Sequence, residues 1–486
     1  MRRDLLRTFG GLLPWVTLMI AALLMWKDTL PYRFVNWDDE AYVLQNPLIR
    51  GWSPDNLKGI ATEVVTRNYA PLTIFSFLLD HTLWGLNPAG YRLTNLLLHS
   101  LNGLLVFAVM RRFCEGQFAA WLTAGLFLVH PIQVESVVWI SSRKGLLCSA
   151  FMLGAVYVRM RPDRSLRDDG WYLLLLVLAL LAKAHAVVLP PVVLLYDLLI
   201  TRRRPIESIA ASIIPGQIAF LFLVMTMGAQ NSIGGGVRGH MDIGLLRILE
   251  ADSLILWEYL RMLLWPVGQC VLYDPPITGI HLTASVAASG WLTVLLLAWW
   301  YRRSQPLFLF GYLTTLLLMF PVLNIMPITT LMNDRYMYLP CIVVFGAVTT
   351  LLSKRIEATQ AVFPGSVLYR GLQTATAGLI LGFAVLRTTE YLPVWKDSFS
   401  LWQHAAAQYP EMPVIQIQLA FTEAQHGRLS TAAEIVERAL EVCQPDDLDR
   451  ERMHRLAVDW RSETDRLRRT AIEHGMTSLP EVSERE

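Results

Sequence analysis

Residues 12–47 read LLPWVTLMIAALLMWKDTLPYRFVNWDDEAYVLQNP, and this stretch decides the fold class. It begins with the apolar run 12–26, which approaches the ~20 residues that cross the hydrocarbon core of a bilayer. Three arginines precede the run and no small-residue cleavage site follows it, so we expect a retained first membrane span rather than a signal peptide. The stretch then presents three consecutive acids, Asp38, Asp39 and Glu40.

The composition extends the membrane interpretation to the whole chain. Of 486 residues, 54% are hydrophobic and only 17% are charged, whereas about a quarter of the residues in a soluble domain are charged. The net charge of +2 gives no basic field that would attract nucleic acid. The five cysteines occur singly and form no Cys/His cluster, so neither a metal site nor a protein-bound cofactor is predicted.

Apolar runs and arginine clusters together predict a membrane topology. We expect roughly eleven transmembrane helices, at residues 12–26, 91–109, 117–129, 146–158, 171–182, 186–200, 209–227, 284–300, 306–320, 336–352 and 372–386. Six arginine-rich clusters fall at alternate ends of these spans, and the positive-inside rule places all six in the cytoplasm. The N-terminus is therefore expected in the cytoplasm and the C-terminus outside it, in a bacterial inner membrane or an equivalent membrane.

The same topology defines the outer loops. They are residues 27–90, 130–145, 183–185, 228–283 and 323–335, and everything after about Arg387. Within the fourth of these loops, the apolar run 248–265 also carries three acids and an arginine. We expect it to form an interfacial or re-entrant helix rather than a full span.

The composition becomes that of a soluble protein from Thr389 onward. Small and apolar residues between Leu419 and Ala439, with Gly427 at the turn, keep the spacing of a tetratricopeptide (TPR) helix–turn–helix repeat. Glu423 departs from the pattern, and a generic helical hairpin is the alternative. We expect a transmembrane catalytic domain over residues 1–390 and a small TPR-like domain outside the cytoplasm over residues 391–486.

The acids of the first outer loop are candidates for catalysis. Asp38, Asp39 and Glu40 lie close to the membrane surface, where acids are costly unless they are used or paired. Adjacent carboxylates repel one another, which raises the pKa of one and leaves a usable base. The alternative is a hydrated loop start without a function.

The second outer loop contains HPIQVESVVWISSRK, residues 130–144, with His130, Glu135, Arg143 and Lys144 in one short segment. Arg143 and Lys144 would form a compact cation pair at the surface. Such a pair suits a phosphate group, because arginine supplies a bidentate fork and lysine a point charge. The alternatives are anchoring of both side chains at the membrane surface and a simple pair between Glu135 and Arg143.

Two further cations lie at the predicted outer face. Lys183 occupies a tight turn between two apolar spans, and Arg335 directly precedes another span. Cations above a lipid-accessible bundle suit a lipid-phosphate donor whose tail stays in the bilayer. A carboxylate could then deprotonate an incoming hydroxyl while the cations stabilise the departing phosphate.

These stretches resemble a known family, the GT-C membrane glycosyltransferases with C-terminal TPR repeats. That group includes the transmembrane and TPR-repeat-containing O-mannosyltransferases and many bacterial membrane TPR proteins. The similar stretches occur in order along nearly the whole chain and are FVNWDDEAYVLQNP (34–47), YAPLTIFSFLLD (69–80), GLNPAGYRLTNLLLH (85–99), HPIQVESVVWISSRKGLL (130–147), LAKAHAVVLPPVVLLYDLL (181–199), DRYMYLP (334–340) and VWKDSFSLWQHAAAQYP (394–410).

The resemblance implies an all-α GT-C fold and an inverting transfer of a sugar, such as mannose, from a polyprenyl-phosphate donor to a hydroxyl of an exported protein. It implies that Asp38 or Asp39 is the catalytic base and that Arg143 and Lys144 bind the donor phosphate, with the TPR-like domain holding the acceptor. Ala70 and Arg92 depart from the family, where histidine is usual. Alternatives are a lipid or glycan acceptor, a non-catalytic membrane scaffold, and a transporter of lipid-linked sugars.

Overall fold

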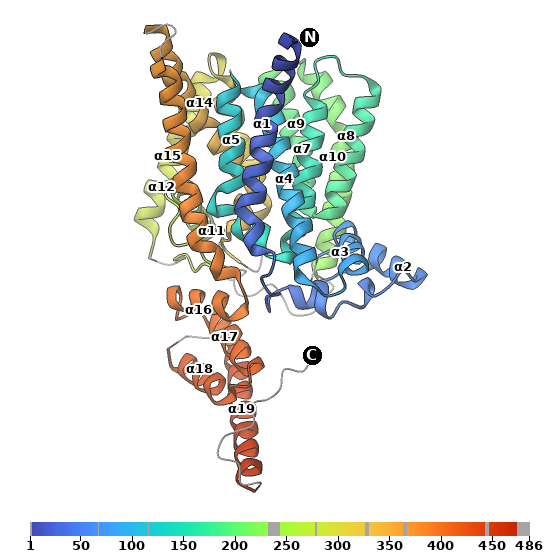
Figure 1. The fold of residues 1–486 in the computed structure, drawn as a ribbon, viewed down its shortest axis with the longest axis vertical. Helices are drawn as coiled ribbons and strands as arrows, with labels where there is room; N and C mark the ends of the chain where they lie inside the picture. Colours follow the sequence, from blue (N-terminus) through green and yellow to red (C-terminus); the bar gives the residue numbers. More distant parts are fainter. Residues whose placement is uncertain are drawn as a thin grey trace. The chain divides into compact units, whose positions relative to one another are not determined.

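The computed structural model describes residues 2–66, 68–114, 116–231, 244–277, 279–325, 330–362, 367–442 and 447–473. Nearly all regular structure in these ranges is helical (Figure 1), and the exception is an isolated bridge between Val65 and Asn68. The all-α prediction is confirmed. Residues 232–243 of the predicted fourth outer loop lie outside the described ranges.

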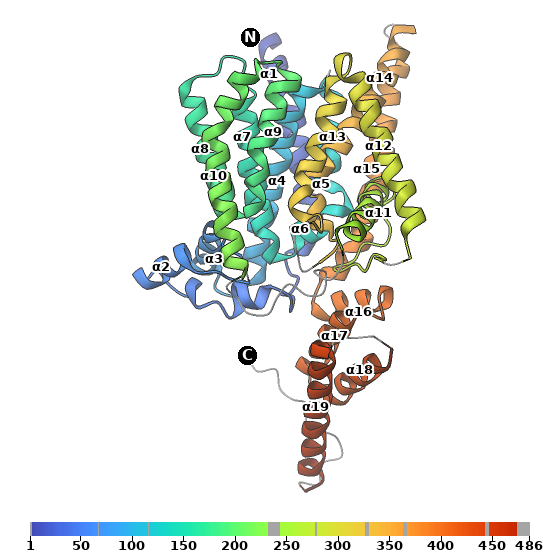
Figure 2. The ribbon, with the colours of Figure 1, turned by 180° about the vertical axis from the view of Figure 1, so that it is seen from behind.

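The chain divides into two compact units. The first, which we call the membrane unit, comprises Met1–Pro31, Asp38–Gln269 and Pro275–Leu392. Figures 1 and 2 show its long helices side by side, with α2 and α3 at the end of the bundle opposite the N-terminus. Its helices are α1 (Arg2–Trp26), α2 (Pro54–Thr62), α3 (Pro71–Trp84), α4 (Pro88–Phe113), α5 (Gln117–Val129), α6 (Val134–Val138), α7 (Arg143–Arg159), α8 (Leu166–Ala182), α9 (Leu189–Leu195), α10 (Pro205–Asn231), α11 (Leu245–Leu264), α12 (His281–Trp300), α13 (Pro306–Met319), α14 (Pro340–Val362) and α15 (Val367–Tyr391).

Local sequence explains where many of these helices begin. Proline is the first residue of α2, α3, α4, α10, α13 and α14, a position where its missing N–H leaves no backbone hydrogen bond unmade. Ser165 caps α8 in a reciprocal pair with Asp168. On α4, a side chain at Gly103 would collide with Leu128 of α5, so glycine permits the close approach of these two helices.

Among the described residues, four helical segments are long and apolar enough to cross a bilayer. They are Gly11–Thr29, Pro88–Phe113, Pro205–Gly228 and His281–Arg303, with a fifth if Gln117–Val129 and Pro131–Val138 form one bent span. The chain is therefore an integral membrane protein, while the count of eleven spans is not confirmed. Each predicted span falls mainly within helix, but α7 and α8 have only 17 residues and α13 has 14, short of the ~20 that cross a bilayer.

The break after α5 shapes the second predicted outer loop. The two helical pieces, Gln117–Val129 and Pro131–Val138, meet at an angle of 53°. Pro131 cannot donate a backbone hydrogen bond, and the side chain of His130 instead accepts one from the N–H of Ile132 at 3.2 Å. Helix α6 then ends at Val138, and the 3-10 helix Ile140–Ser142 follows it.

The second unit, which we call the repeat-like unit, is assembled from three separate segments. They are Tyr32–Trp37, Cys270–Asp274 and Pro393–Glu486. Its helices are α16 (Ser398–Gln408), α17 (Pro413–Gln425), α18 (Leu429–Val442) and α19 (Asp447–Glu473). Small residues line the contact of α17 with α18, and Gly427 takes a φ of 76° in the turn between them. Glu423, the departure from the repeat pattern, is neutralised by an ion pair with Arg428.

Candidate active site

Asp39 joins the first two predicted outer loops. Its side chain is buried, and its Oδ1 accepts hydrogen bonds from the Ser141 backbone N–H at 3.0 Å and the Ser141 hydroxyl at 2.5 Å. Ser141 belongs to the 3-10 turn Ile140–Ser142, which directly precedes α7. A buried carboxylate needs such donors because loss of water disfavours its charge. The Asp39–Ser141 contact therefore fixes the first loop against the start of α7.

Asp38 is the more accessible of the two aspartates. Its side chain is 30% exposed, and its Oδ2 lies 3.5 Å from Lys144 Nζ. The same ammonium lies 3.4 Å from the Tyr42 hydroxyl and 4.7 Å from the centre of the Tyr42 ring. Burial by itself lowers the pKa of Lys144, but Tyr42 and Asp38 outweigh burial and raise that pKa above its ordinary value. Lys144 is therefore a permanent cation beside an acid that solvent can reach.

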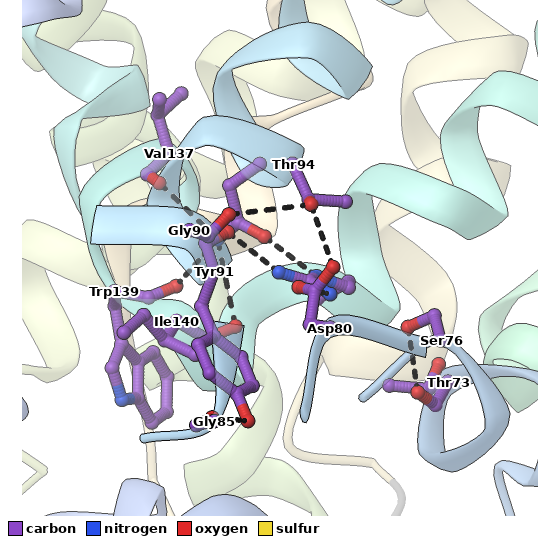
Figure 3. Close-up of polar contacts among 12 residues, drawn as sticks. Thr73, Ser76, Asp80, Gly85, Gly90, Tyr91, Thr94, Val137, Trp139 and Ile140 are labelled. Atoms are coloured by element: carbon purple, nitrogen blue, oxygen red, sulfur yellow. Dashed lines mark hydrogen bonds and ion pairs between the residues drawn. The ribbon is translucent and has the colours of Figure 1, made fainter. Parts of the chain in front are cut away.

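Arg143 points into a separate, buried cluster. Its guanidinium forms an ion pair with Asp80 of α3 and donates to Asn95 Oδ1 at 2.8 Å and to the Tyr91 carbonyl at 2.6 Å. Figure 3 shows Asp80 and Thr94, whose hydroxyl donates to the Asp80 carboxylate at 2.8 Å. This cluster ties α3, α4 and the start of α7 together.

The prediction of a surface pair formed by Arg143 and Lys144 is wrong. Arg143 is completely buried, and Lys144 is 8% exposed. Helix α7 begins at Arg143, and successive helical side chains point roughly 100° apart. The two cations therefore reach different partners, and only Lys144 lies beside Asp38.

Glu135 pairs with Arg335 rather than with Arg143. The Arg335 guanidinium contacts Glu135 Oε1, and the Arg335 backbone N–H donates to Oε2 at 2.9 Å. Burial alone lowers the pKa of Arg335, but the Glu135 carboxylate outweighs it and raises that pKa. Arg335 and Lys144 both lie near the ring of Trp139, at 5.2 and 6.0 Å from its centre. The cations from two predicted outer loops thus gather around one indole.

Lys183 follows α8 and precedes the 3-10 helix Ala184–Val188. Within the described parts of the chain, no carboxylate lies within ion-pair distance of its ammonium. Burial, followed by repulsion from Lys144 and Arg335, lowers the pKa of Lys183 to about 8. Lys183 is thus a half-buried cation that lacks a carboxylate in contact among the described residues.

Lys183 and Arg335 line a small cavity. Its volume is about 30 Å³, and its other lining residues are Gly145, Cys148, Ser149, His185, Tyr336, Tyr338, Leu339 and Pro340. A space of this size holds about one water molecule. The described residues contain no group of three His, Cys, Asp or Glu side chains able to hold a metal ion. Two cations, Lys183 and Arg335, therefore face a narrow cavity at this site.

The remaining predicted residues differ in their surroundings. Glu40 is half-buried and begins the π-helical turn Glu40–Leu44. His130 is buried away from the cavity, with Nδ1 accepting from Ile132 and Nε2 donating to the Leu263 carbonyl at 3.2 Å. Both ring nitrogens of His130 are thereby committed to backbone groups.

Three residues of this region were not predicted from the sequence. Tyr42 contacts Lys144, Asp80 contacts Arg143, and Ser141 contacts Asp39. For Asp80 a signal existed, because an acid at the end of the apolar run TIFSFLLD requires a partner. The serine and the tyrosine carried no comparable signal, because either residue is common in loops of any function.

The amino-acid sequence of this chain is similar to the sequences of several curated proteins. The chain is 21% identical over 410 residues to the protein O-mannosyl-transferase F38B6.6 of Caenorhabditis elegans, covering 80% of this chain and 57% of that protein. It is 33% identical over 170 residues to the protein O-mannosyl-transferase TMTC2 of Homo sapiens, covering 33% of this chain and 20% of that protein. The resemblance inferred from the sequence is confirmed. The chain matches little more than half of the first relative and a fifth of the second.

Solved structures were also compared with the chain. ArnT from Cupriavidus metallidurans bound to undecaprenyl phosphate has a TM-score of 0.41 and 16% identity, covering 89% of this chain and 81% of ArnT. The Archaeoglobus fulgidus oligosaccharyltransferase has a TM-score of 0.45 and 13% identity, covering 83% of this chain and 58% of that enzyme. Both scores are too low to establish a common fold. No protein-family model matches the chain.

Proposed function

We propose that the chain is an inverting glycosyltransferase of GT-C type. It moves mannose from a polyprenyl-phosphate donor to a hydroxyl of an exported protein. The similarity to protein O-mannosyl-transferases supports the reaction class and the acceptor class. Asp38 and the repeat-like unit face the same non-cytoplasmic compartment in this proposal, as the arginine clusters predict.

The observation that carries the proposal is Lys183 in its cavity. A half-buried cation without a carboxylate in contact is unfavourable, because it has lost part of its hydration and no ion pair replaces that loss. A phosphate group supplies the missing negative charge and hydrogen-bond acceptors. Arg335 lines the same cavity, and Lys144 and Arg335 lie near the same indole. A phosphate in this cavity would therefore meet Lys183 and Arg335, while Lys144, which pairs with Asp38, lies near the same indole as Arg335.

In the proposed reaction, Asp38 is the general base, because its carboxylate is exposed and Asp39 is held by Ser141. Asp38 takes the proton of the acceptor hydroxyl, and the hydroxyl oxygen forms a bond to the anomeric carbon. The bond from that carbon to the phosphate oxygen breaks, and its electron pair leaves with the polyprenyl phosphate. Lys144, Lys183 and Arg335 stabilise the charge that develops on the leaving group. Attack opposite to the leaving group inverts the anomeric centre.

The proposal gives Arg143 a different part from the one that the sequence suggested. Its guanidinium is already bound to Asp80, Asn95 and Tyr91, so a phosphate would have to displace those partners. Arg143 therefore holds the start of α7, from which Lys144 reaches Asp38. A cavity of about 30 Å³ must also widen to admit a phosphate. Arg335 and Tyr336 line the cavity at the end of the predicted outer loop 323–335, so movement of this loop would widen it.

Purified protein in right-side-out vesicles tests the proposal, with polyprenyl-phosphate mannose and a membrane-impermeant Ser/Thr peptide. We expect transfer by the native chain, and a fall of about 10²–10⁴-fold in Asp38→Asn, the range attributed to a general base. Donor binding should persist in the variant. Asp55→Asn is the matched control, because Asp55 is an exposed acid of the same loop.

Native transfer rates in Asp38→Asn would remove Asp38 as the base. Transfer only to an added lipid or glycan would replace the protein acceptor. Absence of transfer to all of these acceptors, in a chain that still binds partner proteins through its repeat-like unit, would favour a scaffold.

A further inference from the structure

An open groove lies between α9 and α10 of the membrane unit, two helices that pack against one another (Figure 2). Its volume is about 380 Å³, and it is lined by Leu194 of α9 and by six residues of α10 between Ile209 and Phe220. It shares no lining residue with the cavity of Lys183. The groove is therefore a separate feature of the helical bundle.

The surface of this groove is mainly apolar. Ile209, Ile213 and Phe220 are 54%, 51% and 65% exposed. The Ser212 hydroxyl donates to a backbone carbonyl of its own helix at 2.9 Å, so its proton is not offered to the groove. Gln217 is the other polar residue of the lining. Such a groove suits a hydrocarbon chain better than a polar ligand, because apolar surface gains by leaving water.

The length of the groove matches one leaflet of a bilayer. An α-helix rises about 17 Å from Ile209 to Phe220, at ~1.5 Å per residue, and half of the hydrocarbon core of a bilayer measures about 15 Å. Helix α10 includes Pro205–Gly228, one of the segments that are long and apolar enough to cross a bilayer. Only 17% of the most apolar stretch of this segment is buried, so most of its surface is accessible to lipid.

Positive charge lies directly before the groove. Arg202, Arg203 and Arg204 occupy the turn that precedes α10, and all three are exposed. In the described parts of the chain, no carboxylate lies within ion-pair distance of Arg202 or Arg203. Arg204 lies 3.8 Å from Glu207 in an exposed pair, a kind of pair that contributes little. Because Ile209 lies in the second turn of α10, these cations stand at one end of the groove.

The turn 202–204 is held in an uncommon backbone conformation. Arg202 has a φ of 53°, in the left-handed region that residues other than glycine rarely adopt. Its guanidinium donates to the Arg303 carbonyl at 3.2 Å, and the Arg203 backbone N–H donates to the Asp197 carbonyl at 3.0 Å. These contacts fix the turn against two neighbouring segments, and Arg303 adds a further exposed cation.

We propose that the groove and the turn 202–204 form a binding site for an anionic phospholipid. One acyl chain lies in the groove between α9 and α10, and the headgroup phosphate contacts the arginines of the turn. Arginine suits this role because its planar guanidinium matches a phosphate group in a bidentate fork. The lipid belongs to the leaflet that the arginine clusters predict to be cytoplasmic, where anionic lipids attract basic segments. The proposal does not depend on the proposed transfer reaction.

Native mass spectrometry of the full-length protein tests the headgroup contact, with phosphatidylglycerol and phosphatidylcholine of identical acyl chains as probes. We expect phosphatidylglycerol to bind the native chain at least about tenfold more tightly. In Arg203→Gln/Arg204→Gln its affinity should fall about 10- to 30-fold, as expected for two cations beside an anionic lipid, while phosphatidylcholine binding stays the same. Lys354→Gln/Arg355→Gln is the control, because these exposed cations belong to another predicted cytoplasmic cluster.

A second variant tests the groove. No atom lies within 4 Å of the place that a Cβ would take at Gly216, so Gly216→Leu puts a side chain into open space in the groove. We expect phosphatidylglycerol affinity to fall about tenfold, the loss expected when about two methylene groups leave their contacts. The melting temperature without added lipid should stay native. Gly378→Leu on α15 is the control, because a Cβ there is also free of contacts.

Three results would overturn the proposal. The first is equal affinity of the native chain for the two phospholipids. The second is native phosphatidylglycerol affinity in either site variant, or an equal loss in its control, which would assign the binding to the general charge or apolarity of the surface. The third is a polyprenyl phosphate that binds more tightly than phosphatidylglycerol and is lost in the same variants, because the occupant would then be the donor lipid.

Discussion

Helix α7 carries a charge cluster at each end, and the two clusters differ in how their charges are paired. At its C-terminal end, Arg159 contacts Asp197 and Asp169, and Arg164 also contacts Asp169. Each of these cations has a carboxylate in contact. At its N-terminal end, Lys144 has Asp38 and Arg335 has Glu135, but Lys183 has no carboxylate in contact among the described residues.

The difference distinguishes a structural cluster from the proposed donor-binding site. Arg159 and Asp197 are 4% and 2% exposed and neutralise one another's charge, so this cluster does not call for an added anion. Lys183 is half-buried and has no carboxylate in contact among the described residues, and partial loss of hydration together with repulsion from Lys144 lowers its pKa. An incoming phosphate relieves the cost. The contrast between the clusters leads to three predictions, from the largest expected effect to the smallest.

Breaking the charge cluster at the C-terminal end of α7 should lower the free energy of unfolding and leave donor binding intact. Arg159→Met leaves the buried Asp197 without its partner, which costs about 3–5 kcal/mol of unfolding free energy. Denaturant unfolding in detergent measures this loss. Arg159→Met combined with Asp197→Leu should recover most of it, because an apolar pair replaces an ionic one. A change of donor Kd in the folded single variant would contradict the assignment of this cluster to structure.

Removal of Lys183, the cation without a carboxylate in contact, should weaken donor binding and leave stability intact. In Lys183→Met we expect donor Kd to rise about 10- to 150-fold, the equivalent of about 1.5–3 kcal/mol for a charge-assisted contact. The melting temperature should not fall, because the variant removes a desolvated charge. Calorimetric titration with a polyprenyl phosphate measures Kd, and Lys58→Met, an exposed lysine on α2, is the control. Native affinity in Lys183→Met would exclude this cation from the donor site.

The third prediction concerns pH. With a pKa of about 8 in the empty site, Lys183 loses its proton as pH rises through 8, whereas bound phosphate holds that proton. Donor Kd should therefore rise about tenfold between pH 7 and pH 9. Without donor, the free energy of unfolding should increase as the pH rises from 8 to 10, because the unfolded chain binds this proton more tightly than the folded chain does. Both trends should be missing in Lys183→Met, and an identical Kd profile in that variant would refute the assignment.

The sequence was sufficient to predict the helical membrane class and to single out several residues of the proposed site. Apolar runs and proline starts are local signals, and Asp38, Lys144, Lys183 and Arg335 were identified because charges at span ends are unusual. The pairing of charges could not be predicted in the same way. Arg143 meets Asp80 from 63 residues away, and Arg335 meets Glu135 from 200 residues away. Such partners depend on how helices pack, and no local pattern in the chain encodes that packing.

The discontinuous make-up of the repeat-like unit limits how this protein can be altered. Its helices enclose Tyr32–Trp37 and Cys270–Asp274 as well as the C-terminal residues, and Cys270, Val271 and Leu272 are buried. A truncation after Leu392 would therefore not remove a self-contained module, because it would strip two internal segments of their covering and expose apolar side chains to water. Exchange of this unit between related chains would require three matched pieces to be transplanted together. The C-terminal helices are therefore not an interchangeable attachment, because their unit includes two segments from earlier in the chain.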